Sequence, residues 1–290
     1  MNEATDTKVG RLAPQLRAMA ERITNRKWKL PQPGEVLLKG ILPIVILLIL
    51  WQIIMMIATR NLANPKGLDD VVESFVKLVV EGDAEGHTLV DHTALSVYRV
   101  SLGFLFAFIT ACPLGIAIGR YRVADVVLGP VVEAMRPIPP IAWIPISILL
   151  FQSNFTGAQV FIIWVGAFFP ILLNTTAGVK RTEPVHLDVA STFGASESQI
   201  LSKIILPSAA PEIFAGLRIG FGIGWMCLVA AEIIGGGLGL GYLVFQTQQL
   251  GLIGQTVSAM VVIGVIGFLF SYIFLKTERY LLRYRQEVAV

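Results

Sequence analysis

Long apolar runs alternate with short polar segments along this chain. Runs of about 20 apolar residues match the thickness of the hydrocarbon core of a bilayer. The pattern predicts six membrane-spanning helices, at residues 41–58, 95–119, 126–152, 158–179, 213–234 and 256–275. A short amphipathic helix, which we expect to lie flat on the outer membrane surface, is predicted between the first two from apolar positions at helical spacing: Val71, Val72, Phe75, Leu78 and Val79.

Basic residues concentrate in every second polar segment. If the N-terminus is inside, the inner segments hold Arg120, Arg122, Lys180, Arg181, Lys203, Lys276, Arg279, Arg283 and Arg285, whereas the outer segments 153–157 and 235–255 hold no charge. This is the positive-inside pattern, and it predicts that both termini are cytoplasmic. Of the 290 residues, 54% are hydrophobic and only 15% are charged, against about a quarter charged in soluble domains. We therefore expect an all-α, multi-pass protein of the cell (inner) membrane.

The chain is expected to have four parts. Residues 1–39 form a basic arm, which is either a helix on the membrane surface or partly disordered. Residues 40–88 hold the first span and the outer amphipathic helix. Residues 89–278 form the core, with a cytoplasmic loop at 180–212, and residues 279–290 form a cytoplasmic tail. A cleavable signal peptide is not expected, because the first apolar run follows a long polar arm and no small-residue cleavage pattern comes after it.

One long polar insert, residues 188–207, interrupts the apolar runs of the C-terminal half. It predicts two short helices that meet at a corner formed by Gly194, with Pro207 ending the second. The second is predicted to be amphipathic, from Ile200, Leu201, Ile204 and Ile205. A surface helix–turn–helix between two spans would be a docking site for another protein. An ordinary surface loop is the alternative.

The insert resembles the cytoplasmic loop of permease subunits of ATP-binding-cassette (ABC) importers. That loop carries Glu-Ala-Ala, three residues, Gly, nine residues, Ile, one residue and Leu-Pro. This chain has Asp188-Val189-Ala190, Gly194, Ile204 and Leu206-Pro207 at that spacing, with Asp-Val in place of Glu-Ala. Residues 136–145, 216–220 and 230–232 are similar to the nitrate, sulfonate and taurine group of MetI-like, type I permeases. The resemblance covers roughly residues 89–274.

The resemblance implies a transport subunit rather than an enzyme. It implies a homodimer in the lipid bilayer, two ATP-binding subunits inside and a solute-binding protein outside. ATP and Mg²⁺ would bind the ATPase, since this chain contains no Gly-Lys-Ser/Thr phosphate loop; we expect no cofactor, metal site or nucleic-acid partner here. The expected substrate is a small anion, a sulfonate such as taurine first, then nitrate or bicarbonate. The expected ATPase-coupling residues are Asp188, Ala190, Thr192, Gly194, Ala195, Ser196, Gln199, Ile204, Leu206 and Pro207.

Four prolines, Pro137, Pro139, Pro140 and Pro145, fall in the third span. Because proline lacks a donor and disfavours helical geometry in the preceding residue, we expect this span to be broken near mid-membrane. Broken helices at that depth commonly line a substrate path. We therefore name Arg136, Pro139, Pro140 and Trp143 as pathway candidates. The alternative is a structural kink in which Arg136 caps the carbonyls that the prolines free.

Charged residues within the predicted spans should pair or face water. Counted at about 1.5 Å per residue, Glu133 and Arg218 both fall about 10–12 Å from the cytoplasmic ends, and Arg99 and Glu232 both fall about 30 Å up. These depths predict two ion pairs, Glu133 with Arg218 and Arg99 with Glu232.

Glycines mark two further places in the chain. Those at 216, 220, 222 and 224 predict a fifth span that packs tightly, near the two-fold axis of a dimer. Those at 235, 236, 237, 239 and 241 predict an outer gate or a short re-entrant turn. Two rival functions stay open: an ion-coupled secondary transporter or channel that needs no ATPase, and a membrane scaffold or sensor.

Overall fold

The computed structural model describes residues 42–58, 67–152 and 154–282. The 1–39 arm and the last eight residues of the tail lie outside them. The chain divides into two units, residues 1–65 and 66–290. The first contributes α3 (Leu42–Ala58), an apolar helix of 17 residues, and at about 1.5 Å per residue it is roughly 25 Å long. This helix matches the predicted first span.

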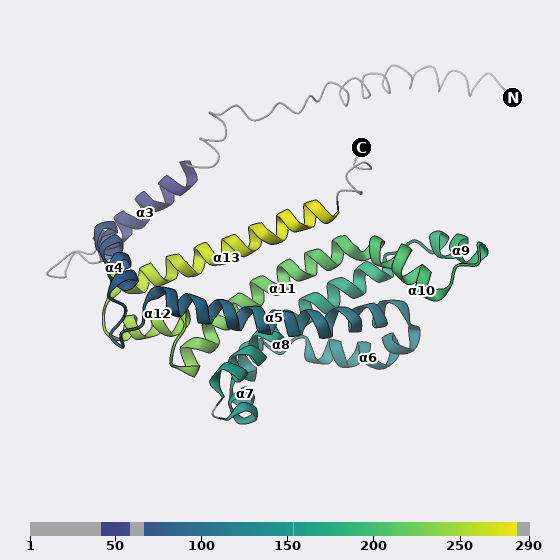
Figure 1. Cartoon of the computed structure of the whole chain (residues 1–290), viewed down its shortest axis with the longest axis horizontal. Coiled ribbons are helices and arrows are strands. Elements are labelled where there is room, and N and C mark those ends of the chain that lie inside the picture. The colour runs from purple at the N-terminus through teal and green to yellow at the C-terminus, as the bar shows by residue number, and fades with distance from the viewer. Residues whose placement is uncertain (1–41, 59–66, 153, 283–290) are drawn as a thin grey trace, which may run out of the picture. The chain divides into compact units, whose positions relative to one another are not determined.

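The second unit is built around four long helices, α5 (Leu89–Arg120), α8 (Phe155–Lys180), α11 (Leu206–Gly235) and α13 (Ile253–Leu281). Each is long and apolar enough to cross a membrane. Helix α8 is central, because its main contacts are with α5 on one side and α11 on the other (Figure 1). With one bent pair of helices, these four give up to five candidate spans in the described residues, and α3 lies where the first span is predicted, so the number is compatible with six.

Glycines let α8 approach its neighbours closely. A Cβ added at Gly220 of α11 would lie 2.9 Å from Ile171 Cγ1, and one added at Gly103 of α5 would lie 2.6 Å from Ile163 Cβ. Helix association inside a bilayer depends on van der Waals packing rather than on escape from water, so these contacts hold the bundle together. The predicted tight packing of the fifth span is present, and its partner within the chain is α8.

The third predicted span is broken. Helix α6 (Arg122–Met135) is followed by the short η2 (Pro140–Trp143) and then by α7 (Ile144–Phe151). The two arms meet at an angle of 90°. The break falls at Pro137 and Pro139, as the sequence predicts, because each proline removes a backbone donor and restricts the residue before it.

Two short helices lie at one end of this unit, and the polar insert lies at the other (Figure 1). The predicted amphipathic helix is α4 (Leu68–Val80), which packs on α13 with Leu78 fully buried. Ser258 Oγ of α13 donates a hydrogen bond to the Val71 carbonyl at 2.9 Å. Helix α12 (Leu240–Gln249) is a correction, because the sequence predicted only a gate or turn there.

Candidate functional site

The polar insert folds as two short helices around a glycine corner. Helix α9 (Pro184–Thr192) ends just before Gly194, whose φ is +78°. The Ala195 N–H donates to the Ala190 carbonyl at 3.0 Å, and the Gly194 N–H donates to the Ser191 carbonyl at 3.0 Å. Glycine adopts this left-handed geometry without the steric cost of a Cβ. The predicted corner at Gly194 is confirmed.

The second helix of the insert starts with a reciprocal cap. Helix α10 (Glu197–Ile200) is preceded by Ser196, whose backbone N–H donates to Gln199 Oε1 at 2.9 Å. The Gln199 N–H donates to Ser196 Oγ at 3.4 Å. The two predicted coupling residues Ser196 and Gln199 thus fix the direction in which the chain leaves the corner.

Pro207 does not end the second helix, contrary to the prediction. Helix α10 runs through the π-helical turn η3 (Leu201–Ile205) into α11, which gives one continuous helix, Glu197–Gly235. Pro207 lies in the first turn of α11. The wider π-turn just before it changes the hydrogen-bond ladder at the point where proline would otherwise disrupt it.

The insert is anchored by its apolar side. Ile200 and Ile205 are buried in a cluster with Val179 of α8 and Ala209 of α11. Of the predicted coupling residues, Ala190, Ala195, Ile204 and Leu206 are half-buried, whereas Asp188, Thr192, Gly194, Ser196 and Gln199 are exposed. The insert therefore has a packed base and an exposed tip.

Ion pairs attach the insert to the ends of the long helices. Arg120 Nη2, at the end of α5, lies 2.8 Å from Glu197 Oε2 of α10. Arg181 Nη1, at the end of α8, lies 2.7 Å from Glu212 Oε1 of α11. Pairs near the surface add little stability, but the first pair joins α10 to α5, and the second joins the end of α8 to α11.

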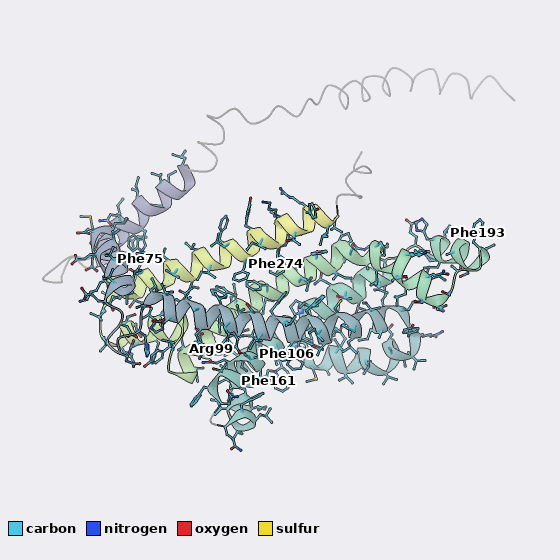
Figure 2. The ribbon with its side chains drawn as sticks, viewed as in Figure 1. Phe75, Arg99, Phe106, Phe161, Phe193 and Phe274 are labelled. Carbon is cyan, nitrogen blue, oxygen red and sulfur yellow. The ribbon has the colours of Figure 1, made fainter. Side chains whose placement is uncertain are left out.

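Phe193 is a residue of this tip that sequence reasoning did not single out. Its side chain is 86% exposed, and it projects at the end of the bundle beyond α9 (Figure 2). Val185 and Val189 of α9 are also exposed. An aromatic residue between Thr192 and Gly194 in an otherwise polar insert was the available signal. Exposed aromatic anchors are typical of protein interfaces.

A buried polar cluster occupies the other end of the bundle. As predicted, Arg99 of α5 pairs with Glu232 of α11, with Nη1 2.9 Å from Oε1, and both side chains are at least 95% buried. Ser96 Oγ donates to Glu232 Oε1 at 2.8 Å. The Gly241 N–H, in the first turn of α12, donates to Glu232 Oε2 at 2.9 Å. The carboxylate therefore also caps α12, where the helix dipole favours a negative charge.

A histidine that the sequence analysis left unassigned extends this cluster. His92 Nε2 lies 3.1 Å from Asp83 Oδ2, and the Gly239 N–H lies 3.0 Å from His92 Nδ1. His92, Ser96 and Arg99 recur at intervals of four and three residues, so they share one face of α5. The face reaches the glycine-rich segment 235–241, since Arg99 Nη1 also donates to the Leu238 carbonyl at 2.6 Å.

Beside this cluster, Glu85 connects the segment before α5 to helix α12. Its Oε1 accepts hydrogen bonds from the Tyr242 hydroxyl at 2.8 Å and from Gln246 Nε2 at 2.9 Å, both of α12. This hydrogen bond to Glu85 raises the pKa of Tyr242 above its usual value. The segment before α5 and the helix after the glycines are therefore joined directly.

The predicted pair of Glu133 with Arg218 is wrong. Glu133 Oε1 lies 3.4 Å from Arg136 Nη1 on its own helix end, and Arg218 Nη1 lies 3.2 Å from Glu278 Oε2 of α13. Counting residues gave a similar depth for Glu133 and Arg218 but not the face of the helix on which each lies. Helix α6 packs against α5, and Arg218 of α11 is directed to α13.

The pathway candidates do not converge on one cavity. Arg136 is about half exposed and has Glu133 as its partner in the described part of the chain. Pro139 is exposed, and Pro140 is half-buried. Trp143 lines a cavity of about 350 Å³ between α5, α6 and α8, whose other lining residues are apolar. Across residues 42–58, 67–152 and 154–282, no group of three His, Cys, Asp or Glu side chains could hold a metal ion.

Comparison with known proteins gives close relatives. The chain is 35% identical over 246 residues to the taurine transport system permease protein TauC of Escherichia coli, covering 84% of this chain and 88% of that one. It is 33% identical over 263 residues to the bicarbonate transport system permease protein CmpB of Synechococcus elongatus, covering 89% and 93%. It is 33% identical over 227 residues to the nitrate import permease protein NrtB of Synechocystis, covering 78% and 82%.

The fold is also known. The structure matches a chain of the methionine ABC transporter MetNI in an inward-facing conformation with a TM-score of 0.59 and 19% identity, over 66% of this chain and 95% of that chain. Residues 103–282, which hold the insert and most of the helices described above, match the family model of the binding-protein-dependent transport system inner membrane component. The chain therefore belongs to that family, the membrane-spanning permease subunits of ABC importers.

Proposed function

We propose that two copies of this chain form the translocation pathway of an ATP-driven importer for a small anion. In this proposal residues 180–212 are the site at which a separate ATPase couples to the pathway. The observation that carries it is the construction of the insert, whose base is packed into the bundle around Ile200 and Ile205 while Phe193 is exposed at its tip. Because its base is packed into the bundle, the insert can transmit a displacement of the bound ATPase to the membrane helices.

The continuous helix supports this mechanism. The segment Glu197–Gly235 has 39 residues, which at about 1.5 Å per residue makes it roughly 58 Å long. It begins at the insert and ends at the cluster around Glu232. Closure of the ATPase pair would move both inserts, and α11 would carry that displacement through the membrane as a rigid-body motion.

The proposed substrate is an anion, a sulfonate such as taurine first, with nitrate and bicarbonate as the other candidates. Support comes from the relatives with similar identity, which are named for taurine, bicarbonate and nitrate transport. Arg136 beside the 90° break is a cation that could favour an anion on the path. Selection among these solutes would rest mainly with the binding protein outside.

The proposed orientation has both termini in the cytoplasm, with the ATPases at the insert and the solute-binding protein at the opposite surface. The distribution of Lys and Arg supports it. The insert and helices α4 and α12 lie at opposite ends of their unit (Figure 1), as an inside surface and an outside surface must.

The test is reconstitution of the full chain with its cognate ATP-binding subunit and solute-binding protein. Phe193→Ala should weaken ATPase binding by at least about 30-fold, which corresponds to an interface anchor worth 2 kcal/mol or more. Tyr280→Ala, at a side chain 75% exposed on α13, is the matched control and should bind normally. Solute uptake by the chain alone, without the ATPase, would overturn the proposal in favour of a secondary transporter.

A further inference from the structure

Helices α7, α8 and α11 line a small, partly open cavity beside the arm that follows the 90° break. The space in which the centre of a water molecule can lie is about 10 Å³, and the lining includes Gln159 of α8 and Ser147 of α7. Both side chains are almost completely buried, at 2% and 1% exposed. Around them lie apolar residues of a packed cluster, among them Ile144, Ile162 and Ala231.

Gln159 is unusual among the buried polar side chains of the described residues. Neither its Nε2 nor its Oε1 has a protein hydrogen-bond partner there. A primary amide removed from water without a partner is costly, and buried polar groups are nearly always satisfied by protein atoms or by an internal water. The amide also faces α11 closely, because a Cβ added at Gly235 would lie 2.7 Å from Gln159 Nε2.

Ser147 offers the second polar contact. Its hydroxyl donates a hydrogen bond to the Ile144 carbonyl at 2.7 Å, so its oxygen keeps lone pairs that can accept one. Gln159 provides N–H donors and a carbonyl acceptor. The cavity wall therefore presents both donors and acceptors inside an otherwise apolar cluster.

We propose that this cavity is a binding site for one internal water molecule, held by Gln159 and Ser147. To hold a water, a cavity needs two to four polar partners and roughly 10–15 Å³ of space in which the centre of the water molecule can lie. The water accepts from Gln159 Nε2 and donates to Ser147 Oγ. It thereby forms a polar link between α7 and α8 at a contact that is otherwise apolar.

Other occupants fit the cavity less well. A metal cation such as Ca²⁺ needs six or more oxygen ligands, and the two side chains supply too few. The space of about 10 Å³ admits the centre of about one water molecule, so an inorganic anion or an organic solute, being larger, does not fit there. Water satisfies both the size of the cavity and the mixture of donors and acceptors.

A structure of the assembled transporter at a resolution that shows ordered waters tests the proposal directly. We expect one solvent peak within hydrogen-bonding distance of both Gln159 and Ser147. In the Gln159→Met variant, which keeps the length of the side chain but removes the amide, that peak should be lost. An empty cavity in the unmodified protein, an amide bonded instead to protein atoms, or a peak that persists in Gln159→Met would each overturn the proposal.

A double-mutant cycle in thermal unfolding gives a second readout on the same residues. Ser147→Ala also removes the hydrogen bond to the Ile144 carbonyl, so it should lower the melting temperature in both backgrounds. If Gln159 and Ser147 share one water, the decrease should be clearly larger in the unmodified protein than in Gln159→Met. Additive shifts would show that no molecule links the two side chains. Both experiments concern the packing of the chain and do not depend on which solute it transports.

Discussion

Arg99 and Glu232 lie 133 positions apart in the sequence, yet their charged atoms are 2.9 Å apart in the interior of the bundle. The pair links α5 to α11, and the carboxylate also holds the first turn of α12 through Gly241. Three helices therefore depend on one buried carboxylate.

Removing one member of this pair should strongly destabilise the protein. Arg99→Met leaves the Glu232 carboxylate buried without its cation, and the free energy of unfolding should fall by about 3–5 kcal/mol. The double variant Arg99→Met with Glu232→Gln removes the unpaired charge but keeps a side-chain acceptor for the Gly241 N–H, so it should recover much of that loss. Unfolding in detergent measures both, with Glu133→Gln as the control because its exposed pair is worth at most about 1 kcal/mol. Equal losses for Arg99→Met and Glu133→Gln would contradict the buried link.

Gly239 should tolerate no side chain. Its φ is +147°, and an added Cβ would lie 2.5 Å from the Glu232 carboxyl group. Gly237 is the matched control, since its φ is +82° but its Cβ would meet nothing within 4 Å. Gly237→Ala should cost about 1–2 kcal/mol from backbone geometry alone, and Gly239→Ala should cost clearly more. Thermal unfolding of the two variants measures this difference. Similar losses of stability in Gly237→Ala and Gly239→Ala would show that the close approach to Glu232 is unimportant.

The pair formed by Arg120 and Glu197 should matter for coupling rather than for stability. One side chain is 27% exposed and the other 71%, so Glu197→Lys should change the free energy of unfolding by no more than about 1 kcal/mol. Because the pair positions α10, we expect transport-coupled ATP hydrolysis to fall in Glu197→Lys. The swapped variant, Arg120→Glu with Glu197→Arg, should restore it. Normal hydrolysis in the single variant would exclude this role.

Arg136→Gln tests the proposed anion pathway. We expect uptake of the anion to be abolished while the dimer and its ATPase still assemble, because the side chain is half exposed and has Glu133 as its partner. Glu133→Gln is the control, and it removes that partner while keeping the cation. Unchanged uptake in Arg136→Gln would assign Arg136 a structural role only.

Much of the architecture was predictable because it depends on local chemistry. The apolar runs predicted the long helices, the prolines around residue 139 predicted the 90° break, and Gly194 predicted the corner of the insert. The depth of Arg99 and Glu232 along their helices was enough to predict their pairing, since the two side chains face each other directly, beside the glycine-rich segment.

The predictions that failed depend on the face of the helix on which a side chain lies and on main-chain hydrogen bonds. Depth alone could not show that Arg218 faces α13, so its pairing with Glu133 was wrong. Helix α12 was missed because its start is stabilised by Glu232, a residue outside it. The hydrogen bond between Gly239 and His92 involves a main-chain N–H that has no counterpart in a pattern of side chains. Pro207 was interpreted as a helix end because a π-turn is not visible in the sequence.

The unbroken course of residues 197–235 has a thermodynamic consequence for an assembled importer. In the proposed importer this one helix connects the ATPase to the outer end of the translocation pathway. ATP binding at one end and binding of the solute-binding protein at the other are then coupled equilibria. By linkage, any factor by which ATP tightens capture of the loaded binding protein must equal the factor by which that protein tightens ATP. Titrating ATP with and without the loaded binding protein, and the binding protein with and without ATP, should give the same factor of change in affinity.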